Sequence, residues 1–578
     1  MSIYDKASLL LIPSGTKASK VYSQKPVSGD GDFTFTRSTG ATRVNADGNI
    51  KKETQNLFLQ SNQFDIGWSA PSGSFTSGQQ GYDGTNDAWL LTASSSGGRL
   101  QLTRSDTGIH TTSAYFKKGS ADGVWMRVDM SGTDANVYVN LIDGSKINST
   151  GEIATEITDI GNGWYRVALT ADWVNVVNFR IYPTNTSGSA VAGNIYLQDA
   201  QLEQGLVARD YIETTTSAVY GGITDNVPRL DYTDSSFPAL LLEPQRTNLV
   251  TQSEYINTSG GWILLNASVT NNSVQSPEGL NNATKLLASS GSGNHQVNSA
   301  TNSIVSGAVT ASVFAKKGNT NFVRLRFSGT SGVVRGWFDL ENGEVGTIDS
   351  GGVGSIIDMG EGWYKCILTE TANTSTTSNN QLQIFINESD NQTSWNAGGD
   401  EYIYIYGAQL EQASYSTSYI PTFGSSVTRV VEAVVKTLGA SYFPTNGISV
   451  FVDFDVTHSS VTNFADLYIL TGSSAQLRLE TRTFGRIYIQ QGNMVTSGDN
   501  FNAYNLCPST AKKICLTFSS TQVKAYVDGV LINTWNGSYT WDFTDLSMGM
   551  QASTAAYNNT MLFPSTLSNQ EAIDLTTL

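Results

Sequence analysis

The amino-acid sequence predicts an all-β protein composed of tandem β-sandwich domains. Of the 578 residues, 39% are hydrophobic and only 15% are charged, while Gly, Ser, Thr and Asn are abundant, as is typical of short strands and many turns. Apolar and polar residues alternate in many segments, and a set of landmarks occurs twice in the same order. The length exceeds what one hydrophobic core accommodates, so we expect several domains.

The internal duplication is defined by four landmarks. The offset between matching residues grows along the chain, which indicates that the second copy has slightly longer loops. The matches are Asn56-Leu57 and Gln60-Ser61 with Asn248-Leu249 and Gln252-Ser253, Lys117-Lys118-Gly119 with Lys316-Lys317-Gly318, GNGWYRVALT from Gly161 with GEGWYKCILT from Gly360, and AQLEQ from Ala200 with AQLEQ from Ala408, followed by Tyr211-Ile212 and Tyr419-Ile420.

Within both copies the hydrophobic period is two, which predicts strands with one buried face. Val124, Met126 and Val128 alternate with Trp125 and Arg127, and residues 322–327 of the second copy alternate in the same way. No helical stretch interrupts either copy, and turns rich in Gly, Ser and Asn separate the strands. We therefore predict jelly-roll sandwiches at residues 55–215 and 248–432, joined by a connecting segment at 216–247.

The last part of the chain, residues 433–578, predicts a different sandwich. Residues 448–456 alternate as ISVFVDFDV, and residues 513–535 form two apolar runs around the hairpin dipeptide Asp528-Gly529. Near the end, Ser568 is followed three residues later by Glu571, a capping-box pattern that predicts a short terminal helix.

Net charge and hydropathy exclude two classes of partner. The net charge of −16 and the pI near 4.7 disfavour nucleic acid and anionic lipid, because both require a basic surface. No apolar run reaches the roughly 20 residues that cross a bilayer, and the first residues, MSIYDKASLLLIPSGTK, do not resemble a secretory signal. We therefore expect that the protein does not insert into a membrane and that it is made and assembled in a cytoplasm.

Catalytic motifs are absent from the sequence, so we expect no enzyme. No GxSxG, HExxH or GxxxxGK[ST] pattern occurs. A glycosidase needs two carboxylates across a cleft, and among 50 acidic residues the sequence alone leaves that option open. The odd cysteine count predicts reduced, buried thiols, and the scattered histidines predict solvated or locally bonded rings rather than a metal site. These residues are Cys366, Cys507, Cys515, His110, His295 and His458.

Several of these motifs resemble known families. The two copies resemble the carbohydrate-binding jelly-roll modules found beside glucanases and xylanases, in the form common in phage structural proteins. Residues 33–50 (FTFTRSTGATRVNADGNI) and 227–249 (VPRLDYTDSSFPALLLEPQRTNL) are similar to stretches of phage tail and fibre proteins. In such proteins these two stretches usually lie close together, whereas here the first copy separates them. Residues 433–578 are similar to the concanavalin A-like, laminin-G-like lectin sandwich.

The resemblance implies a phage virion surface protein, either a tail fibre or a head fibre or decoration, that attaches to host-surface glycans. It further implies a homotrimer, contacts with other virion proteins, and an attachment or assembly role for residues 1–54. Relatives of both sandwich types often carry structural calcium, although no DxDxDG loop identifies a site here. The alternatives are a purely architectural virion protein without sugar binding and a glycan-degrading tailspike.

Glycan-binding candidates are aromatic and Arg side chains on polar strand faces, because sugars pack C–H faces on rings and need planar hydrogen-bonding groups. The alternative interpretation is packing between domains or subunits. Trp164 and Trp363 lie in the duplicated GWY motif and are expected in the core, whereas Trp541 is a weak exposed candidate. The predicted binding residues are Trp125, Arg127, Tyr196, Arg324, Arg326, Tyr402, Tyr404, Tyr406 and Trp535.

Overall fold

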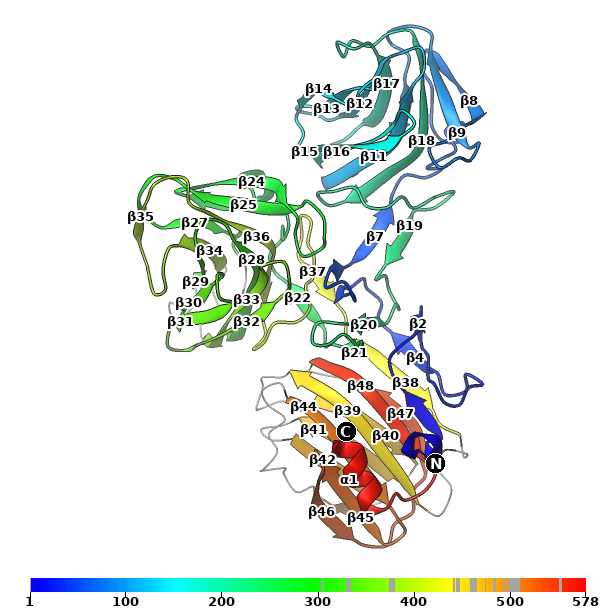
Figure 1. Ribbon diagram of the computed structural model, residues 1–578, viewed down its shortest axis with the longest axis vertical. Helices are drawn as coiled ribbons and strands as arrows, with labels where there is room; N and C mark the ends of the chain where they lie inside the picture. The colour runs from blue at the N-terminus through cyan, green and yellow to red at the C-terminus, as the bar shows by residue number, and fades with distance from the viewer. Residues whose placement is uncertain are drawn as a thin grey trace.

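The computed structural model shows a chain of three β-sandwiches (Figure 1). It describes residues 2–302, 304, 306–328, 334–373, 380–439, 442, 447–457, 465–473, 475–481, 485–491, 494–496, 510–549 and 554–577. Within these residues the regular structure is almost entirely strand, with one α-helix, α1 (Asn569–Thr577), and two 3-10 turns, η1 (Ile3–Lys6) and η2 (Thr258–Gly260). The structure therefore confirms the predicted all-β class with tandem β-sandwiches.

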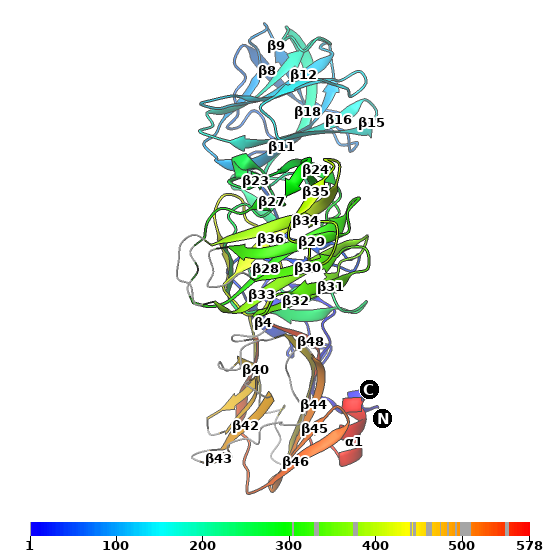
Figure 2. The same cartoon turned by 90° about the vertical axis from the view of Figure 1, so that its left-hand side faces the viewer.

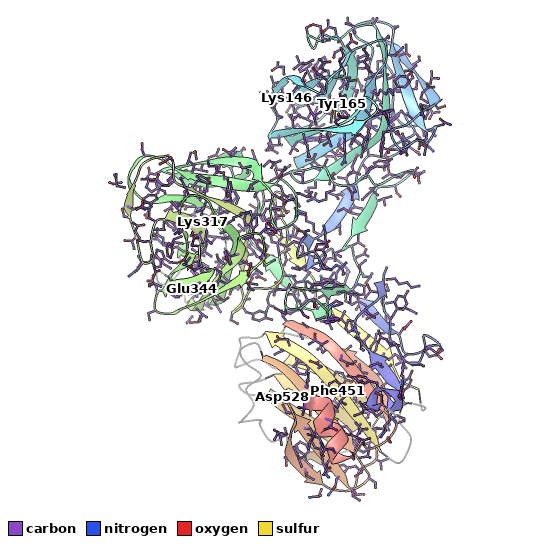
Figure 3. The ribbon with its side chains drawn as sticks, viewed as in Figure 1. Lys146, Tyr165, Lys317, Glu344, Phe451 and Asp528 are labelled. Carbon is purple, nitrogen blue, oxygen red and sulfur yellow. The ribbon has the colours of Figure 1, made fainter. Side chains whose placement is uncertain are left out.

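The first sandwich packs a five-stranded sheet on a six-stranded sheet. The first sheet has the order β10 (Leu100–Thr103), β17 (Asn178–Thr184), β12 (Gly123–Asp129), β13 (Ala135–Asn140), β14 (Lys146–Thr150). The second has the order β15 (Ala154–Gly161), β16 (Trp164–Trp173), β11 (Gly108–Lys118), β18 (Gly193–Gln204), β9 (Ala88–Ala93), β8 (Gly73–Gln79). Val124, Met126 and Val128 are buried in the core between the sheets, as their alternation predicts. Figure 3 shows side chains filling this space, among them Tyr165.

The second sandwich repeats this arrangement with two six-stranded sheets. One has the order β23 (Ile263–Leu265), β27 (His295–Asn298), β34 (Gln381–Asn387), β29 (Phe322–Ser328), β30 (Arg335–Asp339), β31 (Glu344–Ile348). The other has the order β24 (Ala267–Val274), β25 (Ala283–Ala288), β36 (Tyr402–Glu411), β28 (Gly307–Lys317), β33 (Trp363–Asn373), β32 (Gly352–Asp358), and β26 (Gly291–Gly293) pairs with β35 (Trp395–Ala397). The duplicated landmarks therefore occupy matching strands.

The third sandwich has two larger sheets and contains both ends of the chain (Figure 1). The eight-stranded sheet has the order β20 (Arg229–Asp231), β21 (Ala239–Leu242), β48 (Thr554–Phe563), β39 (Ile448–Thr457), β44 (Thr510–Phe518), β45 (Gln522–Val527), β46 (Val530–Asn536), with β1 (Leu9–Leu11) also on β48. The nine-stranded sheet has the order β2 (Thr16–Lys17), β3 (Lys20–Val21), β4 (Phe33–Thr36), β38 (Ala433–Thr437), β47 (Phe543–Met548), β40 (Ala465–Gly472), β41 (Ala475–Thr481), β42 (Gly485–Gln491), β43 (Met494–Thr496).

This third sandwich is discontinuous in sequence, which differs from the predicted division into segments. Leu9 pairs with Leu562 and Leu240 pairs with Tyr557, so residues predicted as an attachment segment (1–54) and a connector (216–247) supply strands to one sandwich. The reason is burial, because Leu9, Phe35 and Leu240 are fully inaccessible within the core of the third sandwich. The two jelly rolls are thus inserted between strands of the third sandwich.

A buried set of charges, the arginine–glutamate cluster, ties these segments together. Its members are Arg37, Arg229, Glu243, Arg429 and Glu432, all with side chains at most 2% exposed. Glu432 accepts from Arg37 at 2.7 Å and from Arg229 Nε at 2.9 Å, while Glu243 accepts from Arg229 and Arg429, each at 2.8 Å. The stretches 33–50 and 227–249 are therefore adjacent in space although the first sandwich separates them in sequence.

A second buried set, the junction cluster, joins the two jelly rolls. Lys52 bridges Glu254 at 2.5 Å and Glu278 at 3.2 Å, and Arg209 bridges Glu203 at 3.2 Å and Glu278 at 3.0 Å. Burial alone would raise the pKa of Glu278, but Arg209 and Lys52 hold it below its ordinary value. Short ribbons lie nearby, in which β7 (Glu53–Asn56) pairs with β19 (Val219–Gly222) and β22 (Arg246–Asn248) with β37 (Val427–Arg429).

The sandwiches follow one another along the long axis of the molecule, with the first sandwich at one end and the third at the other (Figure 2). The last short ribbon, β5 (Arg43–Val44) with β6 (Ile50–Lys51), lies beside the second sandwich, where Ile50 N donates to Pro277 O at 2.8 Å. The first sandwich is therefore the one most distant from the chain ends.

Candidate functional site

A groove of about 670 Å³ lies on the outer face of the six-stranded sheet of the first sandwich. This volume falls within the roughly 300–1,000 Å³ of typical ligand sites. The β8–β9 loop, the β15–β16 turn and the ends of β11 and β18 form its walls. Its lining residues are Gln79, Gln80, Gly81, Tyr82, Gly84, Lys117, Asn162, Trp164 and Tyr196.

Three side chains of the groove come from one row across adjacent strands. Lys117 on β11 is the register partner of Trp164 on β16 and of Tyr196 on β18. Their chain neighbours Phe116 and Ile195 are buried in the core, so strand alternation directs the row to the outer face. The sequence motifs KKG and GWY thus meet at one site because β11 pairs with both strands.

Tyr82 forms a further wall of the groove. Its ring stacks on Tyr115 at 3.9 Å and 9°, and it meets the Trp164 ring at 6.3 Å and 67°. Its hydroxyl donates to Asp199 at 2.9 Å. Burial raises the pKa of Asp199 to about 7, although the hydrogen bond from Tyr82 opposes this shift. The β8–β9 loop is therefore held in place by the aromatic stack and by several hydrogen bonds, among them that from Tyr82 N to Gln198 Oε1 at 3.1 Å.

The groove presents polar groups that the protein itself leaves unused. Among the described residues, none accepts a hydrogen bond from the Trp164 indole N–H or from the Lys117 ammonium, and none stacks a ring on Tyr196. Trp164 as a whole residue is only 2% exposed, yet its indole N–H is not one of the buried side-chain donors that lack a partner, so this donor reaches the surface of the groove. A donor at the groove surface is available to a ligand or to water.

The second sandwich has the same row, but there its polar groups are satisfied. Lys316 is the register partner of Trp363 and Tyr404. The Trp363 indole donates to Gln275 O at 3.0 Å, and Lys316 Nζ donates to Glu361 O at 2.6 Å. The donors that are free in the first sandwich are therefore used by the chain itself in the second.

The second row is also covered by an apolar side chain. Ile50, which is 4% exposed, packs in one cluster with Phe314, Trp363 and Tyr406, and Tyr404 is partly buried against the same cluster. Ile50 thus packs on the outer face of the second sandwich, in the cluster that contains Trp363 of the row. The duplicated row is open in one copy and filled in the other.

The predicted residues Trp125 and Arg127 lie on the opposite sheet. Trp125 is the centre of three stacked rings, Tyr138–Trp125–Tyr182, which we call the aromatic stack. Trp125 stacks on Tyr138 at 5.0 Å and on Tyr182 at 4.5 Å, with planes within about 20°. Both faces of the indole are therefore covered, and its N–H donates to Asn136 at 2.9 Å. Arg127 pairs with Asp129 and Asp134 at 2.5 and 2.7 Å. These groups stabilise the sheet and leave no ring face for a sugar.

The second sandwich keeps this stack with an arginine at its centre. Arg324 replaces Trp125 between Trp337 and Phe385, and its guanidinium lies 3.7 Å from the Phe385 centroid. The Gln392 carbonyl accepts from Arg324 and from Trp337, each at 3.0 Å. Burial, together with neighbouring Arg326, lowers the pKa of Arg324 to about 9. Arg324 is therefore a packing residue rather than a surface group.

The other predicted residues do not gather into one site. Tyr406 is fully buried and its hydroxyl donates to Glu254 and Glu278 at 3.0 and 2.8 Å, which corrects its expected place on a binding face. Tyr402 is half-buried beneath Lys285, whose Nζ lies 3.8 Å from the ring centroid. Arg326 is half-buried on β29, and Trp535 packs against the core of the third sandwich, as does Trp541.

Of the predicted residues, only Tyr196 lines the groove. The groove residues that the sequence did not identify as binding residues are Tyr82, Lys117, Asn162 and the two glutamines. The sequence shows Lys117 and Trp164 as landmarks of the duplication. It does not show which strands pair, and therefore it does not show that these two residues lie beside Tyr196. Trp164 is buried, as expected, yet it also forms part of the groove.

The remaining titratable groups have local partners. His110 and His295 are buried and each ring Nδ1 contacts a backbone carbonyl, at 3.0 and 2.9 Å. Cys366 and Cys515 are buried free thiols, as predicted, and burial raises the pKa of each. Cys507 and His458 lie outside the described residues. In the described part of the chain, no three His, Cys, Asp or Glu side chains cluster as metal ligands, and no helix is long and apolar enough to span a membrane.

Comparison with known proteins does not place the chain in a family. No protein-family model matches it, and no curated protein does. Similar solved structures include a botulinum neurotoxin serotype D binding domain (12% identity, 25% of this chain and 39% of that chain, TM-score 0.21) and the same toxin's ligand binding domain in complex with N-acetylneuraminic acid (13%, 25% and 39%, 0.20). The LG1-3 region of the laminin alpha2 chain has 10% identity over 81% of this chain and 96% of that chain, with a TM-score of 0.16. The chain spans about two fifths of the toxin domains, and TM-scores this low constrain neither fold nor function.

Proposed function

We propose that the first sandwich binds host-surface glycans through the groove lined by Tyr196, Trp164 and Lys117. The observation that carries this proposal is the difference between the two copies. In the second sandwich Ile50 packs in the cluster of Trp363, and the chain itself accepts from Trp363 and Lys316, whereas in the first sandwich the row lines an open groove and its donors have no described partner. The chain therefore pairs one open binding face with one closed architectural face.

The chemistry of the groove suits a sugar. A pyranose ring offers apolar C–H faces, which pack on aromatic rings, and hydroxyls, which need donors and acceptors at defined positions. No described ring stacks on Tyr196, although it packs against the cluster of Tyr115 and Trp164. The position of Tyr402 in the second copy is taken by Asn194, whose amide oxygen accepts from Ser120 N at 2.9 Å. Asn162 and the two glutamines supply amide groups.

We further propose that the protein is a non-enzymatic virion surface protein, a tail fibre or a head fibre or decoration. This part rests on the resemblance of residues 33–50 and 227–249 to phage tail and fibre proteins. The placement of the groove supports it, because the first sandwich lies at the far end of the molecule from the sandwich that contains both chain ends (Figures 1 and 2). We include in this proposal that three copies of the chain form a homotrimer and that this trimer contacts other virion proteins.

A glycan array with the full chain tests the binding proposal. We expect Tyr196→Ala to abolish or strongly weaken binding, because stacking of a sugar on one ring contributes on the order of 1 kcal/mol or more. Tyr220→Ala is the matched control, since Tyr220 is 51% exposed on β19, outside the groove. Absence of binding to any glycan would favour the purely architectural alternative. Release of sugar ends from a bound polysaccharide would favour the tailspike alternative.

A further inference from the structure

The charge of the groove is opposite to the charge of the protein. The chain carries a net charge of −16, yet the groove is lined by one ionised side chain, Lys117, and by no Asp or Glu. The other polar lining groups are amides, the Trp164 indole and two tyrosines. A local excess of hydrogen-bond donors with one cation favours an anionic ligand.

The Lys117 ammonium is available, whereas its counterpart in the second sandwich is not. Each lysine side chain passes the equivalent turn glycine. Lys117 Cε lies 3.8 Å from the position that a Cβ would take at Gly163, and Lys316 Cε lies 3.7 Å from that position at Gly362. Lys316 then donates to Glu361 O at 2.6 Å, but no described residue accepts from Lys117. Lys317, labelled in Figure 3, marks this end of β28.

Three carboxylates near the groove accept hydrogen bonds from neutral side chains. Asp83 accepts from Thr85 Oγ1 at 2.7 Å, Asp87 from Gln198 at 2.7 Å and Asp199 from Tyr82 at 2.9 Å. The adjacent Lys118 pairs with Asp122 at 2.7 Å, so that lysine and its acid balance each other. Lys117 itself forms no ion pair with any of these carboxylates in the described part of the chain.

We propose that the ligand of the groove is an acidic saccharide, a sugar whose carboxylate pairs with Lys117 while its ring packs on Tyr196. Trp164 and Lys117 are register partners, so the indole N–H supplies a second donor on the same side as the ammonium. Asn162, in the β15–β16 turn, adds an amide at the rim. This inference rests on the proposed glycan binding and adds the chemical class of the ligand.

Titration calorimetry of the full chain tests the proposal with pairs of probes that differ only in charge. The probes are oligosaccharides that contain uronic acid or N-acetylneuraminic acid, each measured as the free acid and as its methyl ester. We expect the free acid to bind about tenfold or more tightly than the ester, and Lys117→Met to remove that difference, because a charge-assisted hydrogen bond contributes about 1.5–3 kcal/mol. Added salt should weaken only the acid.

Lys316→Met is the matched control, because Lys316 occupies the equivalent row and is satisfied by the chain. It should leave binding of every probe unchanged, and thermal unfolding should show that both variants fold. Equal affinity for acid and ester, or no loss in Lys117→Met, would overturn the inference while sensitivity to Tyr196→Ala still supported glycan binding. Binding of no probe by the wild-type chain, together with a blank array, would overturn both.

Discussion

Replacing Glu432 by alanine should destabilise the third sandwich strongly. Glu432 is fully buried, accepts hydrogen bonds from Arg37 and Arg229, and also accepts from Glu243 N at 2.9 Å. Glu432→Ala would leave Arg37 without its ion-pair partner and would leave Arg229 and Arg429 to share Glu243. Removal of one partner from a buried ion pair costs about 3–5 kcal/mol.

The expected shift can be read by differential scanning calorimetry of the full chain. At about 2–4 °C per kcal/mol for a domain of this size, the transition of the third sandwich should fall by about 6–20 °C. Asp122→Asn removes an exposed ion pair and should change the midpoint by no more than about 2 °C. If Glu432→Ala lowered the midpoint by no more than Asp122→Asn does, the arginine–glutamate cluster would not hold the segments together.

Three further predictions concern the groove and the packing around it. Asp199→Asn should raise the unfolding temperature of the first sandwich at pH 8 and change it little at pH 4. The reason is that a carboxyl with a folded pKa near 7 destabilises the fold progressively as the pH rises above its unfolded pKa of 3.8. A larger gain in unfolding temperature at pH 4 than at pH 8 would contradict this pH dependence. Trp125→Ala should lower the free energy of unfolding by about 2–4 kcal/mol, measured by thermal unfolding, and leave glycan affinity unchanged. A loss of glycan affinity without a loss of stability would show that the aromatic stack is a binding face. Ile50→Ala should destabilise the contact with the second sandwich by about 2–4 kcal/mol, seen as faster limited proteolysis around residues 45–50. A variant that resists proteolysis as well as the wild-type protein would refute this packing role of Ile50.

Local patterns in the sequence predicted the strands well. Val124, Met126 and Val128 alternate with Trp125 and Arg127, and the structure buries the first three. The duplication predicted two related sandwiches because Lys117 and Lys316, like Trp164 and Trp363, recur in equivalent strands. These features depend on residues a few positions apart, which a sequence displays directly.

Long-range pairing was the part that the sequence could not predict. Leu9 pairs with Leu562, and neither local pattern nor composition indicates that residues so far apart share a sheet. Tyr406 alternates like a surface residue, yet it is fully buried in a cluster with Ile50 and Phe314, which come from distant parts of the chain. The groove was missed for the same reason, since Lys117, Trp164 and Tyr196 meet only through strand register.

A crystal structure of the full chain with a bound acidic oligosaccharide tests the central claim most directly. The account predicts ligand density in the groove, with the sugar ring on Tyr196 and its carboxylate within hydrogen-bond distance of the Lys117 ammonium, and no density over Trp363, where Ile50 closes the second row. Density over the aromatic stack of Trp125, or over the second or third sandwich with the groove empty, would contradict it.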